Sequence, residues 1–494
     1  MLRESFIKSW EFRVILTTGM VGMAAGEMLA AEWVEVTQKK SGKSLEVEVV
    51  SMNEKQLKFK TKAGKVFSVA PSSLTAASVE RVRAQLAAKE KESAGVNEAL
   101  NKVIGHRLFE GGSDLWDQQA GEVAARIKWP KESSTNQSSS FRYYTPSSYQ
   151  FLNAHPYSAT LYGGADGNTS HLSLVFANKG DYGSTAGSAE NHFKKMHPDK
   201  KPPMSLEEAI KLDAELISEA LTGVLGEAEK QYYGEKEDRR RVRRWDFGNH
   251  AFLLSEKDEE YVSVLVVPKK NADLEGKVAF VKDADLKKIV SQNVEKSDNG
   301  DVVIRNIPMV DQGPKGYCAP ATFERAMRYM LVPADMYLLA TSATNPGGGT
   351  NTMLLADSCK RIVRSKARRI KDLDLDKDLK MRRVKQYIDK GVPILWQMRS
   401  LESYNQLANK RTRERGSVDD YTAWATQLQE EADKVAPGME HNESNHHICM
   451  IIGYNEQTNE LAVSDSWGAR YELRWVHIDV AKAVTSRGGF VIDL

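Results

Sequence analysis

Short runs of alternating polar and hydrophobic residues follow position 32. Residues 44–50 (Ser-Leu-Glu-Val-Glu-Val-Val) and 56–61 (Gln-Leu-Lys-Phe-Lys-Thr) alternate with the two-residue period of a β-strand. Ala63 and Gly64 separate the second run from a third one, which favours a hairpin turn. We therefore predict a small SH3-like β-barrel module over residues 32–80.

The pattern changes after this module. Residues 76–103 are rich in Ala, Glu, Lys and Gln, which have high helix propensity and predict a helical linker at 81–103. Residues 104–298 mix strand-like and helix-like segments, so we expect an α+β domain there, although no motif indicates its role.

Three features within residues 104–298 predict local structure. Ser205 and Glu208 have the spacing of a capping box and predict a helix that runs to about Tyr232. The polar residues 132–140 predict a loop. Strands are expected at residues 172–177, 251–254 and 261–267.

A helical pattern also begins at Cys318. Gly313, Pro314 and Gly316 predict a turn just before it, and Pro320 suits the first turn of a helix. The free amides and the dipole of a helix N-terminus lower the pKa of a thiol placed there. Cys318 is therefore a candidate nucleophile for acyl transfer.

Such a cysteine needs a base, and two histidines open a predicted strand far along the chain. His447 follows Cys318 by about 130 residues, and Asp465, which ends a second strand, follows it by about 150, a spacing typical of papain-like enzymes. Adjacent antiparallel strands would bring Asp465 close to His447, where a carboxylate orients the imidazole. His446 competes with His447, and because strand side chains alternate, only one of them can face Cys318.

Three segments resemble the papain-like cysteine peptidase superfamily, and within it the C39-like peptidase domains: 312–321, 447–454 and 463–468. The resemblance covers roughly residues 305–490 and implies a helix-plus-antiparallel-sheet domain, which we place at 299–494. The whole chain is then of the α+β class.

The resemblance also implies roles for individual residues. Cys318 matches the nucleophile, His447 the general base and Asp465 the residue that orients it. Gln312 matches the glutamine whose amide contributes to the oxyanion hole, and Trp467 matches the aromatic residue that shields the His–Asp hydrogen bond. His447 is favoured over His446 because its spacing to the Gly-Tyr pair at 453–454 fits the family.

Each candidate has a plainer alternative. Cys318 could be an inert cysteine at a helix start, Asp465 a turn carboxylate and Gln312 a loop amide. The cysteines at 359 and 449 are expected to fill the core. A histidine- and glutamate-containing cluster at 441–447 could bind a metal, but the sequence contains no HExxH or paired CxxC motif, so we predict neither metal nor cofactor.

The first residues predict export. Arg3, Lys8 and Arg13 precede or open a short apolar run that ends in small residues, the pattern of a signal peptide over residues 1–31. This places the protein in the periplasm or outside the cell. No later segment reaches the ~18 apolar residues of a membrane span, so no permanent span is predicted.

The charge balance and the cysteine count limit which partners and which covalent links are expected. The chain has 494 residues, with 69 Lys and Arg against 67 Asp and Glu, and such a balance argues against a nucleic-acid partner. Three cysteines do not form a disulfide framework. The β module at 32–80 resembles SHD1-type (Sla1 homology) modules, which implies a protein or cell-envelope ligand for it.

The resulting hypothesis is an exported thiol peptidase that hydrolyses a peptide or protein substrate. Two alternatives stay open: transglutaminase-like acyl transfer by the same triad, and a non-catalytic adhesion or scaffold protein. A charged insertion at 399–445, with a predicted amphipathic helix at 419–435, is a candidate lid over the cleft.

Overall fold

The computed structural model describes residues 33–111, 113–182, 205–235, 239–277, 281–313, 316–341, 343, 350–439 and 445–494. The predicted signal peptide lies outside these residues. The chain forms two compact units, one of residues up to Ala99 with Glu110–Gly112, and one of Leu100–Phe109 with Ser113–Leu494. No described helix has the length and hydrophobicity needed to cross a bilayer.

The first unit contains a four-stranded antiparallel sheet in the order β1-β2-β3-β4. Alternate residues of its strands, such as Val47 and Phe59, are buried, as the two-residue period predicts. One isolated bridge joins Gln38 to Leu74, but the described strands β1 and β4 form no ladder, so the sheet is an open meander rather than a closed barrel. The strands are β1 (Val34–Thr37), β2 (Ser44–Met52), β3 (Leu57–Thr61) and β4 (Val66–Val69).

The predicted helical linker is α2 (Ala76–Ile104). The helix begins five residues before the predicted linker and is more than a spacer, because Val82 lies in the core of the small sheet. The resemblance of this module to SHD1-type modules stays a prediction.

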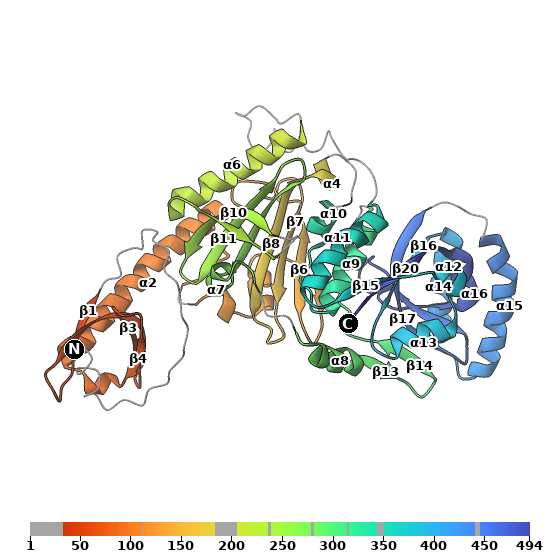
Figure 1. Cartoon of the computed structure of the whole chain (residues 1–494), viewed down its shortest axis with the longest axis horizontal. Coiled ribbons are helices and arrows are strands. Elements are labelled where there is room, and N and C mark those ends of the chain that lie inside the picture. The colour runs from red at the N-terminus through yellow and green to blue at the C-terminus, as the bar shows by residue number, and fades with distance from the viewer. Residues whose placement is uncertain are drawn as a thin grey trace. The chain divides into compact units, whose positions relative to one another are not determined.

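The first part of the second unit is an eight-stranded antiparallel sheet with the helix α6 (Leu206–Leu225) packed along β8, β10, β11 and β12 (Figure 1). Its strands, in sheet order, are β5 (Lys131–Ser134), β6 (Ser139–Tyr144), β7 (Ser158–Gly163), β8 (Thr169–Asn178), β12 (Tyr261–Pro268), β11 (His250–Lys257), β10 (Arg240–Phe247) and β9 (Glu229–Tyr233). Its shorter helices are α3 (Ala120–Arg126), α4 (Lys179–Tyr182) and α7 (Lys269–Asp273).

Two local predictions for this region need correction. The helix capped by Ser205, whose hydroxyl accepts from the Glu208 amide, ends at Leu225 and not near Tyr232, because Gly226 (φ 84°) terminates it and β9 follows. The polar segment predicted as a loop contains most of the β5–β6 hairpin. Ser133 and Ser140 are buried, and the Ser140 hydroxyl donates to Glu132 (3.0 Å), so polar composition did not indicate exposure at these positions.

The C-terminal part of this unit is also antiparallel, with the strand order β13-β14-β17-β16-β20-β15, and β18 joins β17 to β19. The α+β fold class predicted from the sequence is confirmed. The strands are β13 (Val294–Lys296), β14 (Asp301–Ile304), β15 (Arg369–Leu373), β16 (Ile394–Arg399), β17 (His446–Asn455), β18 (Glu460–Ser464), β19 (Arg474–His477) and β20 (Thr485–Asp493).

Helices surround this sheet, and the most buried of them is α9 (Cys318–Tyr329). The core already includes Leu286 and Val290 of α8 (Asp283–Gln292), so it extends N-terminal to residue 299, where the sequence placed the domain boundary. The other helices are α10 (Met336–Thr341), α11 (Thr352–Ser365), α12 (Leu375–Asp378), α13 (Met381–Ile388), α14 (Glu402–Arg415), α15 (Tyr421–Met439) and α16 (Ile478–Val484).

Candidate active site

Cys318 is the first residue of α9, as the sequence predicts, and its side chain is partly buried. Gly313 adopts a positive φ of 67° on the approach to the helix, which glycine allows without strain. The Thr322 hydroxyl donates to the carbonyl of Ile448 (3.1 Å) and fixes α9 against β17. The start of the helix is thereby held beside the strand that begins with the two histidines.

The strand β17 separates those two histidines by the alternation of its side chains. His446 is exposed and pairs in register with Arg399, whereas His447 is buried and pairs with Met398. The His447 imidazole lies beside the Cys318 thiol and shifts its pKa. The structure thus directs His447, and not its neighbour, toward the cysteine.

Asp465 lies at the end of β18, next to β17 in the sheet. Its Oδ1 is 2.7 Å from Nε2 of His447. With Nε2 engaged by the carboxylate, Nδ1 is the ring nitrogen available to the thiol. Three of the four predicted site residues therefore lie together, with the His447 imidazole hydrogen-bonded to Asp465 and beside Cys318.

The three groups shift one another's pKa values. Burial would raise the pKa of the Cys318 thiol, but the hydrogen bond and charge of His447 outweigh it, so that the pKa lies below its ordinary value. Burial would lower the pKa of His447, but hydrogen bonds to Asp465 and Cys318 raise it to about 9. These shifts favour a thiolate–imidazolium pair at neutral pH.

Arg474 of β19 was not predicted from the sequence, yet it contacts the same carboxylate. Its Nη2 donates to Oδ2 of Asp465, and its Nη1 donates to Oδ1 of Asn405 in α14 (2.9 Å). Burial would raise the pKa of Asp465, but the His447 hydrogen bond and the Arg474 charge bring it below its ordinary value. The sequence does offer one indication of this role: Arg474 is the single charged residue in the otherwise apolar run 473–476, and a buried charge needs a partner.

An aromatic residue covers the His–Asp pair. The Trp467 ring stacks on the His447 imidazole, with ring centroids 4.7 Å apart and planes 26° apart. The Arg474 guanidinium lies 5.4 Å from the centroid of the same indole. Trp467 is thus in the place that the family resemblance implied for it.

Gln312, the fourth predicted residue, is tied to the turn that follows Asp465. Its backbone N–H donates to the carbonyl of Ser466 (2.8 Å), and its side-chain Oε1 accepts from the Ser466 hydroxyl (2.9 Å). Because the side-chain oxygen is engaged in this way, the amide nitrogen is the end of the side chain that can donate to a bound anion.

A search against protein families assigns this region. Residues 304–483 match the model described as the Peptidase_C39 like family. Over these residues the chain is similar to C39-like peptidases, and we call this segment the C39-like domain. No curated protein matches the chain significantly.

The remaining cysteines of the C39-like domain lie in its core. Cys359 in α11 and Cys449 in β17 are fully buried and unpaired, and burial raises the pKa of both thiols, that of Cys359 to about 12. Among the described residues, no three His, Cys, Asp or Glu side chains are grouped to hold a metal. Part of the 441–447 cluster considered above, His441 and Glu443, lies outside the described residues.

The insertion of the C39-like domain forms the helices α14 and α15. Trp424, Leu428 and Ala432 are buried along α15, as the amphipathic pattern predicts. Arg415, at the end of α14, forms ion pairs with Asp301 of β14 and with Glu460 of β18. Buried charges thus fasten these helices to the sheet, and their role as a lid stays a prediction.

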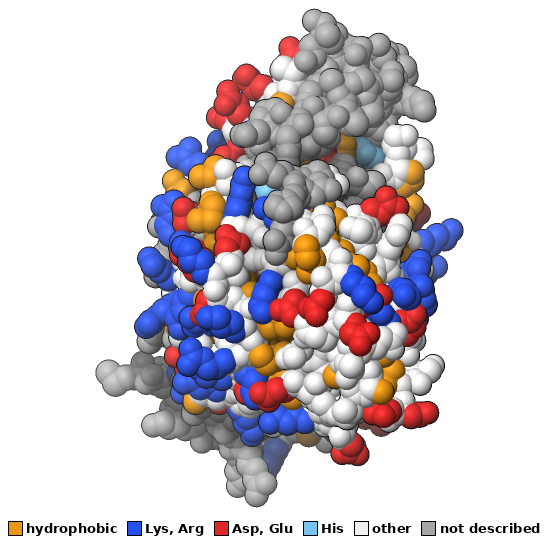
Figure 2. All heavy atoms as spheres, turned by 90° about the vertical axis from the view of Figure 1, so that its right-hand side faces the viewer, with side chains coloured by type: hydrophobic (Ala, Val, Ile, Leu, Met, Phe, Trp, Pro, Cys, Tyr) orange, Lys and Arg blue, Asp and Glu red, His pale blue; other side chains and the backbone are white. Residues whose placement is uncertain are grey.

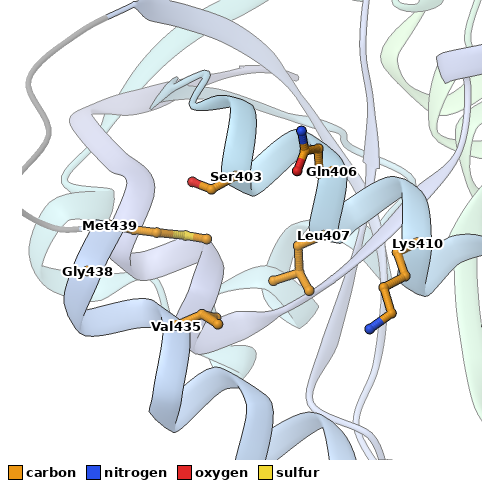
Figure 3. A pocket seen from close by; sticks show the side chains of 7 residues that line it. All are labelled: Ser403, Gln406, Leu407, Lys410, Val435, Gly438 and Met439. Atoms are coloured by element: carbon orange, nitrogen blue, oxygen red, sulfur yellow. The ribbon is translucent and has the colours of Figure 1, made fainter.

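The two insertion helices also enclose a groove of about 480 Å³ (Figure 3). Its lining combines apolar side chains with a few polar ones, and none of the four predicted site residues lines it. The lining residues are Ser403, Gln406, Leu407, Lys410, Val435, Gly438 and Met439.

Figure 2 shows the end of the molecule that carries this part of the C39-like domain. Basic and acidic side chains are interspersed on the coloured part of this face, and hydrophobic side chains appear between them in small groups. Scattered apolar side chains are normal on a protein surface and do not indicate a docking site.

Proposed function

We propose that this protein is an exported cysteine peptidase whose catalytic residues are Cys318, His447 and Asp465. The observation that carries the proposal is the position of the His447 imidazole, which is hydrogen-bonded to the Asp465 carboxylate and interacts with the Cys318 thiol. The family assignment of residues 304–483 supports the same reaction class and a peptide or protein substrate. Export rests on the N-terminal sequence pattern alone.

The reaction would begin with the thiolate of Cys318. The sulfur attacks the scissile carbonyl carbon, and the carbonyl oxygen becomes an oxyanion. The backbone N–H of Cys318 and the amide of Gln312 would stabilise that oxygen. The N–H belongs to the first turn of α9, where backbone amides have no partner within the helix.

His447 would then act as acid and base in turn. As imidazolium it protonates the leaving amine, and as neutral imidazole it removes a proton from the water that hydrolyses the thioester. Asp465 keeps the ring oriented and stabilises its charged form. Trp467, which stacks on the His447 ring, would shield the hydrogen bond between the two from water.

The test compares the wild type with Cys318→Ala and Cys359→Ala on a mixture of fluorogenic peptides. We expect cleavage by the wild type and by Cys359→Ala, whose altered thiol lies in the core, and none by Cys318→Ala. Cleavage that persists in Cys318→Ala would refute the proposal. Added primary amines would appear in the products if the acyl group passes to amines instead of water.

A further inference from the structure

The β5–β6 hairpin of the eight-stranded sheet contacts the segment that carries Gln312. The Ser133 hydroxyl accepts from the Met309 amide (3.0 Å), and Oε1 of Glu132 accepts from the Asp311 amide (3.2 Å). The Tyr144 hydroxyl donates to the carbonyl of Asp311. Three hairpin side chains thus fix the backbone on the N-terminal side of Gln312.

Asp311 and Tyr144 also contact Gly313, the residue that follows Gln312. The Asp311 carboxylate accepts from the Gly313 amide (2.9 Å) and so closes a turn around Gln312. The Tyr144 ring packs against Gly313, since a Cβ there would lie 3.4 Å from the ring. The hairpin therefore supports both sides of the proposed oxyanion donor.

Buried charges hold the hairpin itself in place. Arg142 of β6 donates from Nε to Glu132 (2.9 Å) and from Nη2 to both carboxylate oxygens of Glu324 (2.8 and 2.9 Å). Glu324 lies within α9, the helix that Cys318 begins, and both Arg142 and Glu324 are buried. A shift of Arg142 would leave the buried Glu324 with Arg328 (3.2 Å) in place of two guanidinium partners, and partly unpaired buried charges are costly.

An apolar cluster next to Cys318 also joins the eight-stranded sheet to the C39-like domain. Tyr317, the residue before Cys318, is buried in it together with Val175 of β8 and Val310. The Tyr317 hydroxyl lies 3.4 Å from the Asp181 carboxylate of α4. The eight-stranded sheet and its neighbouring helix therefore contact the chain at Gly313 and at Tyr317, on either side of the residues between them.

We propose that this hairpin is part of the active site and that Tyr144 and Glu132 are positioning residues for the oxyanion hole. The inference rests on the proposed function and extends it to residues 104–298, for which the sequence indicated no role. Without the hairpin contacts, the Gln312 amide would lose its fixed position relative to Cys318. The nucleophile would stay ionised, because its pKa depends on His447.

The test separates thiolate formation from oxyanion stabilisation in the full-length protein. Alkylation of Cys318 by iodoacetamide requires a thiolate but creates no oxyanion, whereas peptide hydrolysis requires both. Tyr144→Phe removes the hydroxyl and keeps the ring against Gly313. Tyr143→Phe is the matched control, because the Tyr143 ring packs edge-on against Tyr149 (centroids 5.1 Å apart) within the same sheet.

We expect Tyr144→Phe to lower kcat by about ten-fold, a part of the ~10²–10³-fold effect of losing an oxyanion donor outright. In Tyr144→Phe, KM and the alkylation rate of Cys318 should stay at wild-type values. In Tyr143→Phe, kcat, KM and the alkylation rate should all stay at wild-type values. Ser133→Ala, which removes the acceptor for Met309, should act in the same direction with a smaller effect.

Two results would overturn the inference alone: a wild-type kcat in both Tyr144→Phe and Ser133→Ala, or a fall in kcat matched by an equal fall in the alkylation rate. The second result would indicate general damage to the fold. Absence of Cys318-dependent hydrolysis in the wild type would instead refute the proposed function and this inference together.

Discussion

Arg474 binds the carboxylate oxygen of Asp465 that His447 leaves unoccupied. The carboxylate is fully buried, and each of its two oxygens has a side-chain partner. Arg474 also reaches α14 through Asn405. The insertion is thereby connected to the proposed catalytic residues through one guanidinium.

We predict that Arg474→Met destabilises the protein by about 3 kcal/mol, because it leaves a buried carboxylate with an unpaired oxygen. Activity should fall as well, since Asp465 would lose a contact that orients it. Thermal unfolding and peptide hydrolysis measure the two effects. Arg470→Met is the control, because Arg470 is exposed in the segment between β18 and β19, and it should match the wild type.

Activity should follow a bell-shaped pH profile. The thiolate forms as the pH rises through the pKa of Cys318, which lies below its ordinary value, and the imidazolium is lost as the pH rises through about 9. Measuring kcat/KM from pH 4 to 11 should therefore give an alkaline limb near pH 9. An alkaline limb near the ordinary histidine pKa would contradict the proposed ion pair.

Asp465→Asn should move that profile in a defined direction. Loss of the negative charge removes a cause of the raised His447 pKa, so the alkaline limb should shift to lower pH. The thiol should then ionise at higher pH, because a neutral imidazole stabilises the thiolate less. The pH dependence of Cys318 alkylation measures this second shift, and an unchanged profile would refute the assigned role of Asp465.

The two adjacent histidines should differ sharply on substitution. We expect His447→Ala to lower kcat by at least about 10³-fold, because it removes the proposed acid and base. His446→Ala removes an exposed ring and should keep wild-type kcat. Loss of activity in His446→Ala with retention in His447→Ala would reverse the assignment.

Replacing the buried Asp213 of α6 should stabilise the protein to a degree that depends on pH. Burial raises its pKa to about 7, against the hydrogen bond from the Ala177 amide. The ionised form is therefore penalised in the folded state: the penalty is absent below the unfolded pKa near 4, grows with pH, and is complete above about 7. We expect Asp213→Asn to raise the free energy of unfolding by about 1–3 kcal/mol at pH 8 and little at pH 4.

Urea denaturation at pH 4, 6 and 8 tests this prediction. Asp258→Asn is the control, since Asp258 is exposed and its substitution should change stability equally little at each pH. A difference between Asp213→Asn and the wild type that does not grow with pH would contradict the explanation by burial.

Local patterns predicted the elements that carry the proposed chemistry. The turn and helix at Cys318 follow from glycine, proline and apolar spacing, and the choice between His446 and His447 agrees with strand alternation. These features depend on residues close in sequence. The family resemblance supplied the long-range pairing with Asp465, which periodicity alone does not fix.

The features that the sequence analysis missed depend on tertiary contacts. Arg474 is a lone charge whose partner lies nine positions away across a strand pair, and only the folded structure brings the two together. Residues 132–140, which form part of the β5–β6 hairpin, were predicted as a loop because their polar side chains resemble exposed ones. Glu132 and Arg142 instead satisfy one another in the interior.

The ion pair between Arg142 and Glu324 has a consequence for chimeric proteins. Transplanting residues 304–483 into another host would remove Arg142 from the buried Glu324, which would keep Arg328 as a partner, or would expose the apolar cluster around Tyr317 to solvent. We therefore expect residues 304–483 not to fold stably on their own. A chimeric protein that is to keep the activity should also include the strands β5 and β6.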